Sequence, residues 1–200
     1  MQIIKRYILV VLLAVAGVVP AHAAITPLSV AIVPPVQFPP SDFSVTGFRF
    51  SVGFGRHRDV YGIDLGLIGN ITEQEFIGIG VSGVFNYTTG NVTAFGTQLA
   101  GVTNINMQKT TVIGVQAALI ANYNKAESAI NGVQVSLANL ADHTHIRGVQ
   151  LGLYNSARTV YGFQIGLINR TENLYGLQIG LMNFHHKGIF SVAPLLNIGF

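Results

Sequence analysis

The chain has 200 residues, of which half are hydrophobic, 10% are charged and 23 are glycine. This length suits one all-β domain, and so few charges are unusual for a protein whose whole surface meets water. The chain has no cysteine, which excludes disulfides, thiolate metal sites, thiol nucleophiles and a lipid-anchored lipoprotein.

The first segment has the pattern of a signal peptide. Lys5 and Arg6 precede an apolar run over residues 7–19, and small residues precede a cleavage point after Ala23. A retained membrane anchor is the alternative, and it needs about 20 apolar residues. Without residues 1–23 the chain keeps nine basic and eight acidic residues, so its net charge is near +1 and we expect no nucleic-acid partner.

Residues 24–42 are rich in proline, with five prolines in this short stretch. Proline cannot donate a ladder hydrogen bond, so the segment is expected to be an extended lead-in or linker. The ordered domain is then expected to start near Phe43 and to continue to the last residue, so that residues 43–200 form one repeat domain.

A repeated unit, GxQxGLxN in its clearest copies, fills most of this domain. Within a copy, Phe163 and Ile165 alternate with Gln164, which is the period of a β-strand. Turn-forming residues and nearly all charges lie between the copies. The leading glycines are spaced 16, 18, 18, 18, 16, 14 and 14 residues apart, and they are Gly62, Gly78, Gly96, Gly114, Gly132, Gly148, Gly162 and Gly176.

These spacings lead us to expect antiparallel strands. A ten-residue strand spans about 33 Å, whereas a four-residue turn spans at most about 14 Å, too short to bring the chain back for a parallel neighbour. Further strands at residues 48–54 and 190–200 bring the count to about ten, an even number as in bacterial outer-membrane barrels. We therefore predict an antiparallel up-and-down meander, closed as a small outer-membrane β-barrel.

Lipid is the expected partner of the apolar strand faces, because no second layer is evident in the sequence; a soluble sandwich is the alternative. Leu196, Ile198 and Phe200 resemble the terminal signal of outer-membrane barrel proteins, which makes the barrel assembly machinery a second expected partner. The absence of tryptophan and the uniformly short connections depart from typical barrels. These departures argue against a porin-like role.

The GxQxGLxN repeat also resembles a family of bacterial exported surface-repeat proteins, and the likeness covers residues 61–184. That family has no assigned biochemical activity. The resemblance therefore implies an exported, surface location, and it implies no reaction.

Glutamines recur at one position of successive repeats, on the face expected to line the barrel lumen. They suit a narrow uncharged pore or a site for sugar-like solutes; alternatively, their amides bond across strands and plug the interior. Arg49 and Asp64 lie on the same face and are expected to form a structural ion pair or a gate. The glutamines are Gln98, Gln116, Gln134, Gln150, Gln164 and Gln178.

Two histidine clusters raise the possibility of a metal site. One contains Asp142, His143 and His145, and the other contains His185 and His186. The barrel topology would place them at opposite ends, so we expect solvated turn histidines and no metal or cofactor.

No catalytic arrangement is evident. No histidine falls in a predicted strand, so the strand serines lack a base and the protein is not expected to be an enzyme. A barrel enzyme acting on lipids or cell-wall material is the least favoured reading. The sequence favours an outer-membrane or surface β-repeat protein with a structural, narrow-pore or solute-binding role. The alternative is a secreted or surface scaffold that binds an unknown partner through its turns or its Gly/Gln face.

Overall fold

The computed structural model describes residues 24–188 and 191–200, so the expected signal peptide and Phe190 lie outside the described residues. Within the described ranges the regular structure consists of strands, and no helix there is long and apolar enough to cross a membrane. The strands are β1 (Ile25–Val33), β2 (Val36–Phe38), β3 (Ser44–Ser51), β4 (Phe54–Gly66), β5 (Gly69–Ser82), β6 (Phe85–Thr88), β7 (Asn91–Ala100), β8 (Thr103–Asn106), β9 (Thr110–Ala118), β10 (Ala121–Asn124), β11 (Ser128–Val135), β12 (Ala138–Leu151), β13 (Tyr154–Ile165), β14 (Ile168–His185) and β15 (Val192–Gly199).

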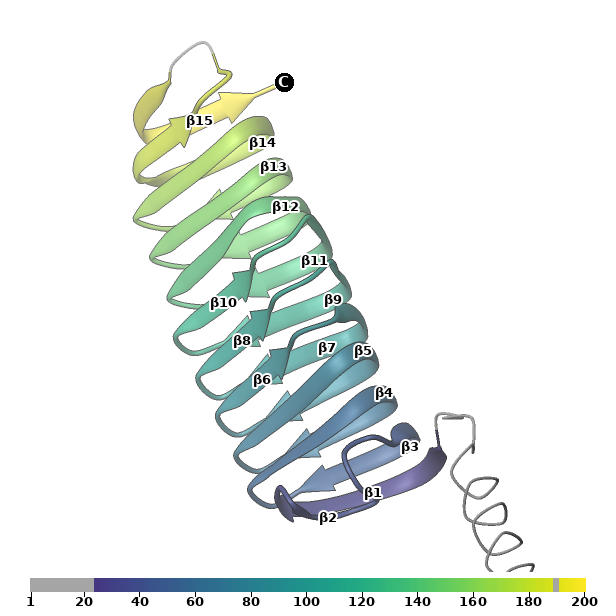
Figure 1. The fold of residues 1–200 in the computed structure, drawn as a ribbon. Coiled ribbons are helices and arrows are strands. Elements are labelled where there is room, and N and C mark those ends of the chain that lie inside the picture. The colour runs from purple at the N-terminus through teal and green to yellow at the C-terminus, as the bar shows by residue number, and fades with distance from the viewer. Residues whose placement is uncertain (1–23, 189–190) are drawn as a thin grey trace, which may run out of the picture.

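The strands form a β-solenoid, in which the chain winds in about ten stacked coils (Figure 1). Neighbouring coils pair in parallel and in register, so that Gly148 lies beside Gly162 and Gly162 beside Gly176. The prediction of an antiparallel meander closed into a barrel is therefore wrong, although the all-β class is right.

The length argument failed because each repeat does not form one straight strand. In the coil that contains Gly162, residues 160–165 run in one direction, and residues 168–171 run back after a turn at residues 166–167. We call these two parts the Gln segment and the Asn segment of a coil. Six residues in one direction span only about 20 Å, so a return segment of similar reach fits within 14 to 18 residues.

A glycine with positive φ begins each of the eight repeats, and the reason is steric. Gly162 has a φ of +133°, and a Cβ atom there would collide with the carbonyl oxygen of Gly148 in the coil below. A side chain at this position would therefore meet both an unfavourable backbone angle and a backbone atom. The leading glycine allows the close stacking of the coils.

The inside of each coil is mainly polar and the outside is mainly apolar. One buried row of apolar side chains runs along the interior and includes Val45, Val60, Phe76, Val112, Ile130, Ile146, Val160 and Leu174. The rest of the interior is filled by amides, hydroxyls and a few charged groups. The large apolar residues that alternate with them, such as Phe163 and Ile165, face outward and are exposed.

Both ends of the parallel stack carry an antiparallel strand. At the first end, β1 pairs in parallel with β3 and in antiparallel fashion with β2. Part of the expected lead-in of residues 24–42 is thus a coil of the solenoid. At the other end, β15 runs antiparallel along β14 and covers the last coil.

Candidate functional site

The glutamines expected to line a lumen form a continuous ladder inside the solenoid, which we call the Gln ladder. Each Nε2 donates to the Oε1 of the glutamine in the preceding coil at 2.7–2.8 Å, from Gln116 bonding to Gln98 up to Gln178 bonding to Gln164. Asn197 of β15 donates to Gln178 at 3.1 Å and ends the ladder. All of these glutamine side chains are buried.

A second ladder runs along the Asn segments, and we call it the Asn ladder. Its amides bond from coil to coil at 2.8–3.0 Å, and most also donate to a backbone carbonyl where the chain turns between segments. Sequence reasoning assigned these asparagines no structural role. They are Asn70, Asn86, Asn104, Asn122, Asn139, Asn155, Asn169 and Asn183.

The two ladders leave little space between them. A cavity of about 10 Å³ lies where Gly80 takes the ladder position and leaves a gap between Asp64 and Gln98. A space of this size holds about one water molecule. The glutamines are therefore paired with each other in a closed interior, as the plugged alternative expected, and the pore that assumed an open barrel has no basis in this fold.

Arg49 and Asp64 occupy ladder positions in the first coils and form a bidentate ion pair. Arg49 Nε and Nη2 donate to the two carboxylate oxygens at 2.7 and 2.6 Å, and neither side chain is more than 3% exposed. Arg49 also donates to the carbonyl of Ile71 at 2.9 Å. β3 and β4 are parallel, so the pair joins neighbouring coils where a hairpin was expected.

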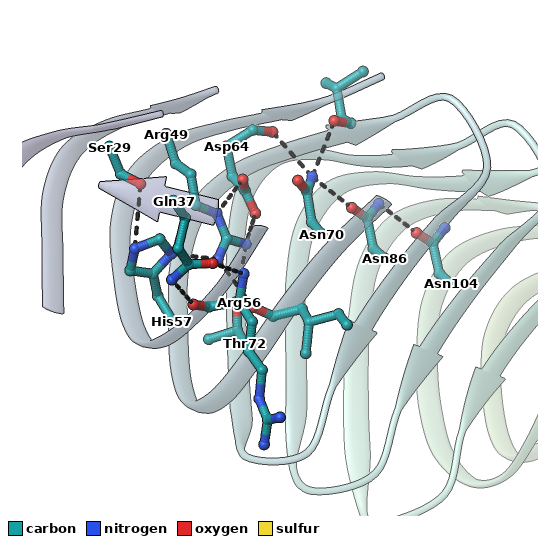
Figure 2. A network of polar contacts seen from close by, with 12 residues as sticks. Ser29, Gln37, Arg49, Arg56, His57, Asp64, Asn70, Thr72, Asn86 and Asn104 are labelled. Carbon is teal, nitrogen blue, oxygen red and sulfur yellow. Dashed lines mark hydrogen bonds and ion pairs between the residues drawn. The ribbon is translucent and has the colours of Figure 1, made fainter. Parts of the chain in front are cut away.

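His57 completes this buried group, and the expectation that no histidine lies in a strand is wrong here. It lies in β4, with Nε2 at 3.2 Å from Ser29 Oγ and Nδ1 at 3.4 Å from Arg49 Nη1 (Figure 2). Nε2 also lies 3.3 Å from the carbonyl oxygen of Pro39. Burial, with a further contribution from the charge of Arg49, lowers the pKa of His57 to about 4. The Ser29–His57 contact is closed to solvent, so it offers no catalytic site.

The histidine clusters share one edge of the solenoid, so their expected separation at opposite ends is wrong. Asp142, His143 and His145 lie in β12 between an Asn segment and the next Gln segment, whereas His185 and His186 lie where the last Asn segment ends, with His186 N–H donating to the carbonyl of Thr171. His145 lies 3.8 Å from Glu127. His185 is not solvated as expected: it is buried and its Nε2 accepts the backbone N–H of Leu174 at 3.1 Å. Burial, followed by the charge of His186, lowers its pKa. The described residues hold no group of three potential metal ligands from His, Cys, Asp and Glu.

The turns from a Gln segment to the next Asn segment form what we call the apolar edge. Their outward side chains are 37 to 67% exposed, and the turn sequences contain no charged residue. The repeat consensus carried this signal, because its Leu follows the second glycine in the GLxN part. The edge comprises Leu67, Ile68, Val84, Leu119, Ile120, Leu137, Leu153, Leu167, Ile168, Leu181 and Met182.

The opposite turns form a charged edge. Its residues include Arg56, Glu73, Lys109, Lys125, Glu127, Asp142, Arg158, Glu172 and Lys187. A groove of about 390 Å³ at this edge is lined by residues including Lys109, Glu127 and His145. The two edges divide the surface, since most charged side chains gather on one side of the coil and the turn leucines on the other. Arg147, beside Tyr161, and Arg170, which follows Asn169, are exposed on the flat faces.

Tyrosines lie on both flat faces close to the charged edge. Tyr61, Tyr161 and Tyr175 precede the leading glycines, and Tyr87 and Tyr123 follow members of the Asn ladder. Tyr161 and Tyr175 stack with ring centroids 4.6 Å apart. These five rings thus lie at the border between the charged edge and the apolar faces, whereas Tyr154 pairs with Ile168 at the apolar edge.

The residues expected to form a terminal barrel signal lie in or next to β15. Leu196 and Ile198 are about half exposed and Phe200 is 99% exposed. An apolar groove of about 450 Å³ lies between β14 and β15 and is lined by Tyr175, Leu177, Ile198 and Phe200, among others.

Comparisons with known proteins found no matching family model, curated protein or solved structure.

Proposed function

We propose that this protein is an exported structural scaffold that binds the outer membrane by placing its apolar edge in lipid. The observation that carries the proposal is the division of the surface. The apolar edge continues along the solenoid without a charged residue, whereas most of the exposed charged side chains collect at the opposite edge. Exposed apolar surfaces of this extent are characteristic of protein or membrane contacts.

The backbone of a solenoid is compatible with lipid. Hydrocarbon cannot hydrogen-bond to free N–H and C=O groups, so a lipid-facing chain must satisfy these groups internally. Here adjacent coils pair through their backbones, including the turn residues of the apolar edge, where Leu167 N–H donates to the carbonyl of Leu153 at 3.0 Å. The polar ladders face inward and bond from coil to coil, and within the described residues only Asn70 Oδ1, at the first end of the Asn ladder, is a buried ladder oxygen or nitrogen without a partner.

The dimensions also suit one leaflet. A Gln segment spans about 20 Å, and the hydrocarbon of one leaflet is about 15 Å thick. The apolar edge and much of each flat face would then lie in hydrocarbon, with the charged edge among the headgroups. The tyrosine rows next to the charged edge would lie at the interface, where tyrosine is enriched in membrane proteins.

A second candidate function is a soluble surface scaffold that binds a partner through its turns. The groove lined by Lys109, Glu127 and His145 favours it, because this hollow lies at the charged edge and presents groups of both signs. The barrel assembly machinery, expected only through the barrel fold, has no part in either proposal.

Vesicle flotation tests the membrane proposal. The protein without residues 1–23 is mixed with vesicles of phosphatidylethanolamine and phosphatidylglycerol, and the floating fraction is measured. Leu153→Glu with Leu167→Glu is expected to lower partitioning about 100-fold or more, since a charged residue in hydrocarbon costs about 2–3 kcal/mol. The matched control is Gln74→Glu with Gln108→Glu, which adds the same charge at exposed positions away from the apolar edge.

The wild type and the control are expected to float with the vesicles. The variant with Leu153→Glu and Leu167→Glu is expected to remain in the bottom fraction. A wild-type protein that stays soluble and monodisperse without detergent and does not bind the vesicles would overturn the membrane proposal and favour the soluble scaffold.

A further inference from the structure

We propose that residues 195–199 of β15 pair with the same segment of a second copy, giving a two-fold symmetric, tail-to-tail dimer. This inference concerns the end of the solenoid and does not depend on the apolar edge. It rests on the backbone of the last strand, on the side chains beside it, and on the contrast between the two ends.

The outer edge of β15 is open. β15 is the last strand of the sheet and pairs only with β14 among the strands of the described residues. Its sequence, VAPLLNIG, contains no charged residue, and Leu195, Leu196 and Ile198 are about half or more exposed. Long uncharged edge strands are templates for pairing with another chain, and proteins usually protect them with charge, proline or a cover.

The opposite end is protected in this way. β2 has only three residues, and it lies between two proline pairs, Pro34 with Pro35 and Pro39 with Pro40. Proline lacks the N–H that a further strand would need. In β15 the one proline, Pro194, lies between Ala193, which pairs with Asn183, and Leu195, which pairs with Gly180. Residues 195–199 follow it and keep their donors.

An antiparallel pair of identical strands is closed and symmetric, since each copy offers the other the same edge. A two-fold axis near Asn197 would place Asn197 opposite its counterpart. Asn197 is buried and ends the Gln ladder by donating to Gln178; within the described residues its side chain has no other hydrogen bond. The dimer would extend the ladder across the interface and cover Leu196 and Ile198.

Paired charge variants test this dimer in sedimentation equilibrium. Protein without residues 1–23, in density-matched detergent, is expected to give a concentration-dependent mass of two chains. Leu196→Lys with Ile198→Lys, and separately Leu196→Glu with Ile198→Glu, should be monomers, because like charges opposite each other destabilise strand pairing. Mixing these two variants should restore the dimer, and Gln74→Lys with Gln108→Lys is the control that should dimerise normally.

Cross-linking gives a second measurement that keeps the wild-type charge. The register places Leu196 opposite Ile198 of the second copy, so a mixture of the Leu196→Cys and Ile198→Cys proteins is expected to form disulfides between copies. The chain has no other cysteine, and Gln74→Cys on the charged edge is the control. Efficient cross-linking of the mixture, and not of the control, supports the pairing. A wild type of single-chain mass, a Lys variant that still dimerises, or equal cross-linking of the mixture and the control would overturn it.

Discussion

Arg49 and Asp64 show that equivalent positions in successive coils can carry side chains of different charge. Both take the ladder position that glutamine takes from Gln98 onward, and each satisfies the other in the closed interior. Asp64→Asn is expected to destabilise the protein by about 3–5 kcal/mol, because it leaves the Arg49 charge buried without its partner. Urea unfolding followed by circular dichroism measures the loss.

The matched variant is Arg49→Gln with Asp64→Gln, which replaces the pair by ladder residues. It is expected to lie within about 2 kcal/mol of the wild type, since exchanging a whole buried ion pair is often close to neutral. A double variant as unstable as Asp64→Asn would mean that the pair does more than fill the ladder.

His57 makes the stability of the first coils depend on pH. Its pKa is about 4 in the folded protein and about 6.5 when unfolded, so at neutral pH both states hold the ring neutral. As the pH falls from about 6.5 to about 4, the unfolded state takes up the proton first, and stability decreases by at most about 3 kcal/mol. Below pH 4 this loss levels off.

Comparison with His57→Gln isolates this effect, because glutamine keeps a donor and an acceptor but does not titrate. The difference between the two proteins in unfolding free energy should change across the window from pH 6.5 to 4. Parallel pH profiles would exclude His57 as the source.

At the scale of elements, the Gln ladder ties neighbouring strands together along the solenoid. Gln134 donates to Gln116 and accepts from Gln150, so Gln134→Leu removes two ladder bonds at once. We expect a loss of about 2–4 kcal/mol, because the neighbouring amides lose buried partners. Gln108→Leu, at an exposed position of the charged edge, should change the melting temperature little; similar losses for both variants would contradict a role for the ladder.

The strands show which elements were predictable. The alternation of Phe163, Gln164 and Ile165 predicted strands and their two faces correctly, because alternation depends only on local backbone geometry. Strand direction depends on where the chain bends within a repeat. The bend at Gly166-Leu167 has the same sequence as Gly176-Leu177, which lies inside β14, so the sequence did not indicate the bend. His57 was missed for a related reason, since its burial depends on the coil that covers it.

At the scale of the molecule, each coil contacts mainly its neighbours, so the fold should tolerate removal of one whole coil. Deleting residues 148–161 joins Arg147, the equivalent of Tyr161, to Gly162 and brings Gln164 beside Gln134. We expect a folded β-protein of lower melting temperature, as in other repeat proteins. Circular dichroism and thermal unfolding check this.

Deleting only residues 155–161 is the control. It removes half a coil, so that residues of a Gln segment would have to follow the path of an Asn segment without Asn155 of the Asn ladder, and it should prevent folding. If both deletions fold equally well, the coil is not the structural unit.

The sequence pattern could not distinguish this solenoid from a membrane barrel, for a physical reason. Apolar-out, polar-in alternation is shared by a membrane barrel and by this solenoid, so the exposed row of leucines fits either fold. What separates them is the in-register stacking of Gly148 on Gly162 and of each ladder amide on the next. That stacking follows from the similarity of adjacent repeats.

The ladders and the backbone bonds between coils run along the solenoid axis, and this direction determines how the molecule would respond to force. Tension applied to the two ends loads the coils in series, so the coil with the weakest bonds separates first while the others stay folded. Each coil that opens would release 14 to 18 residues, or about 50–60 Å of extended chain. The same polar interior that stiffens the molecule at rest would thus let it lengthen in steps under load, as an extensible tether.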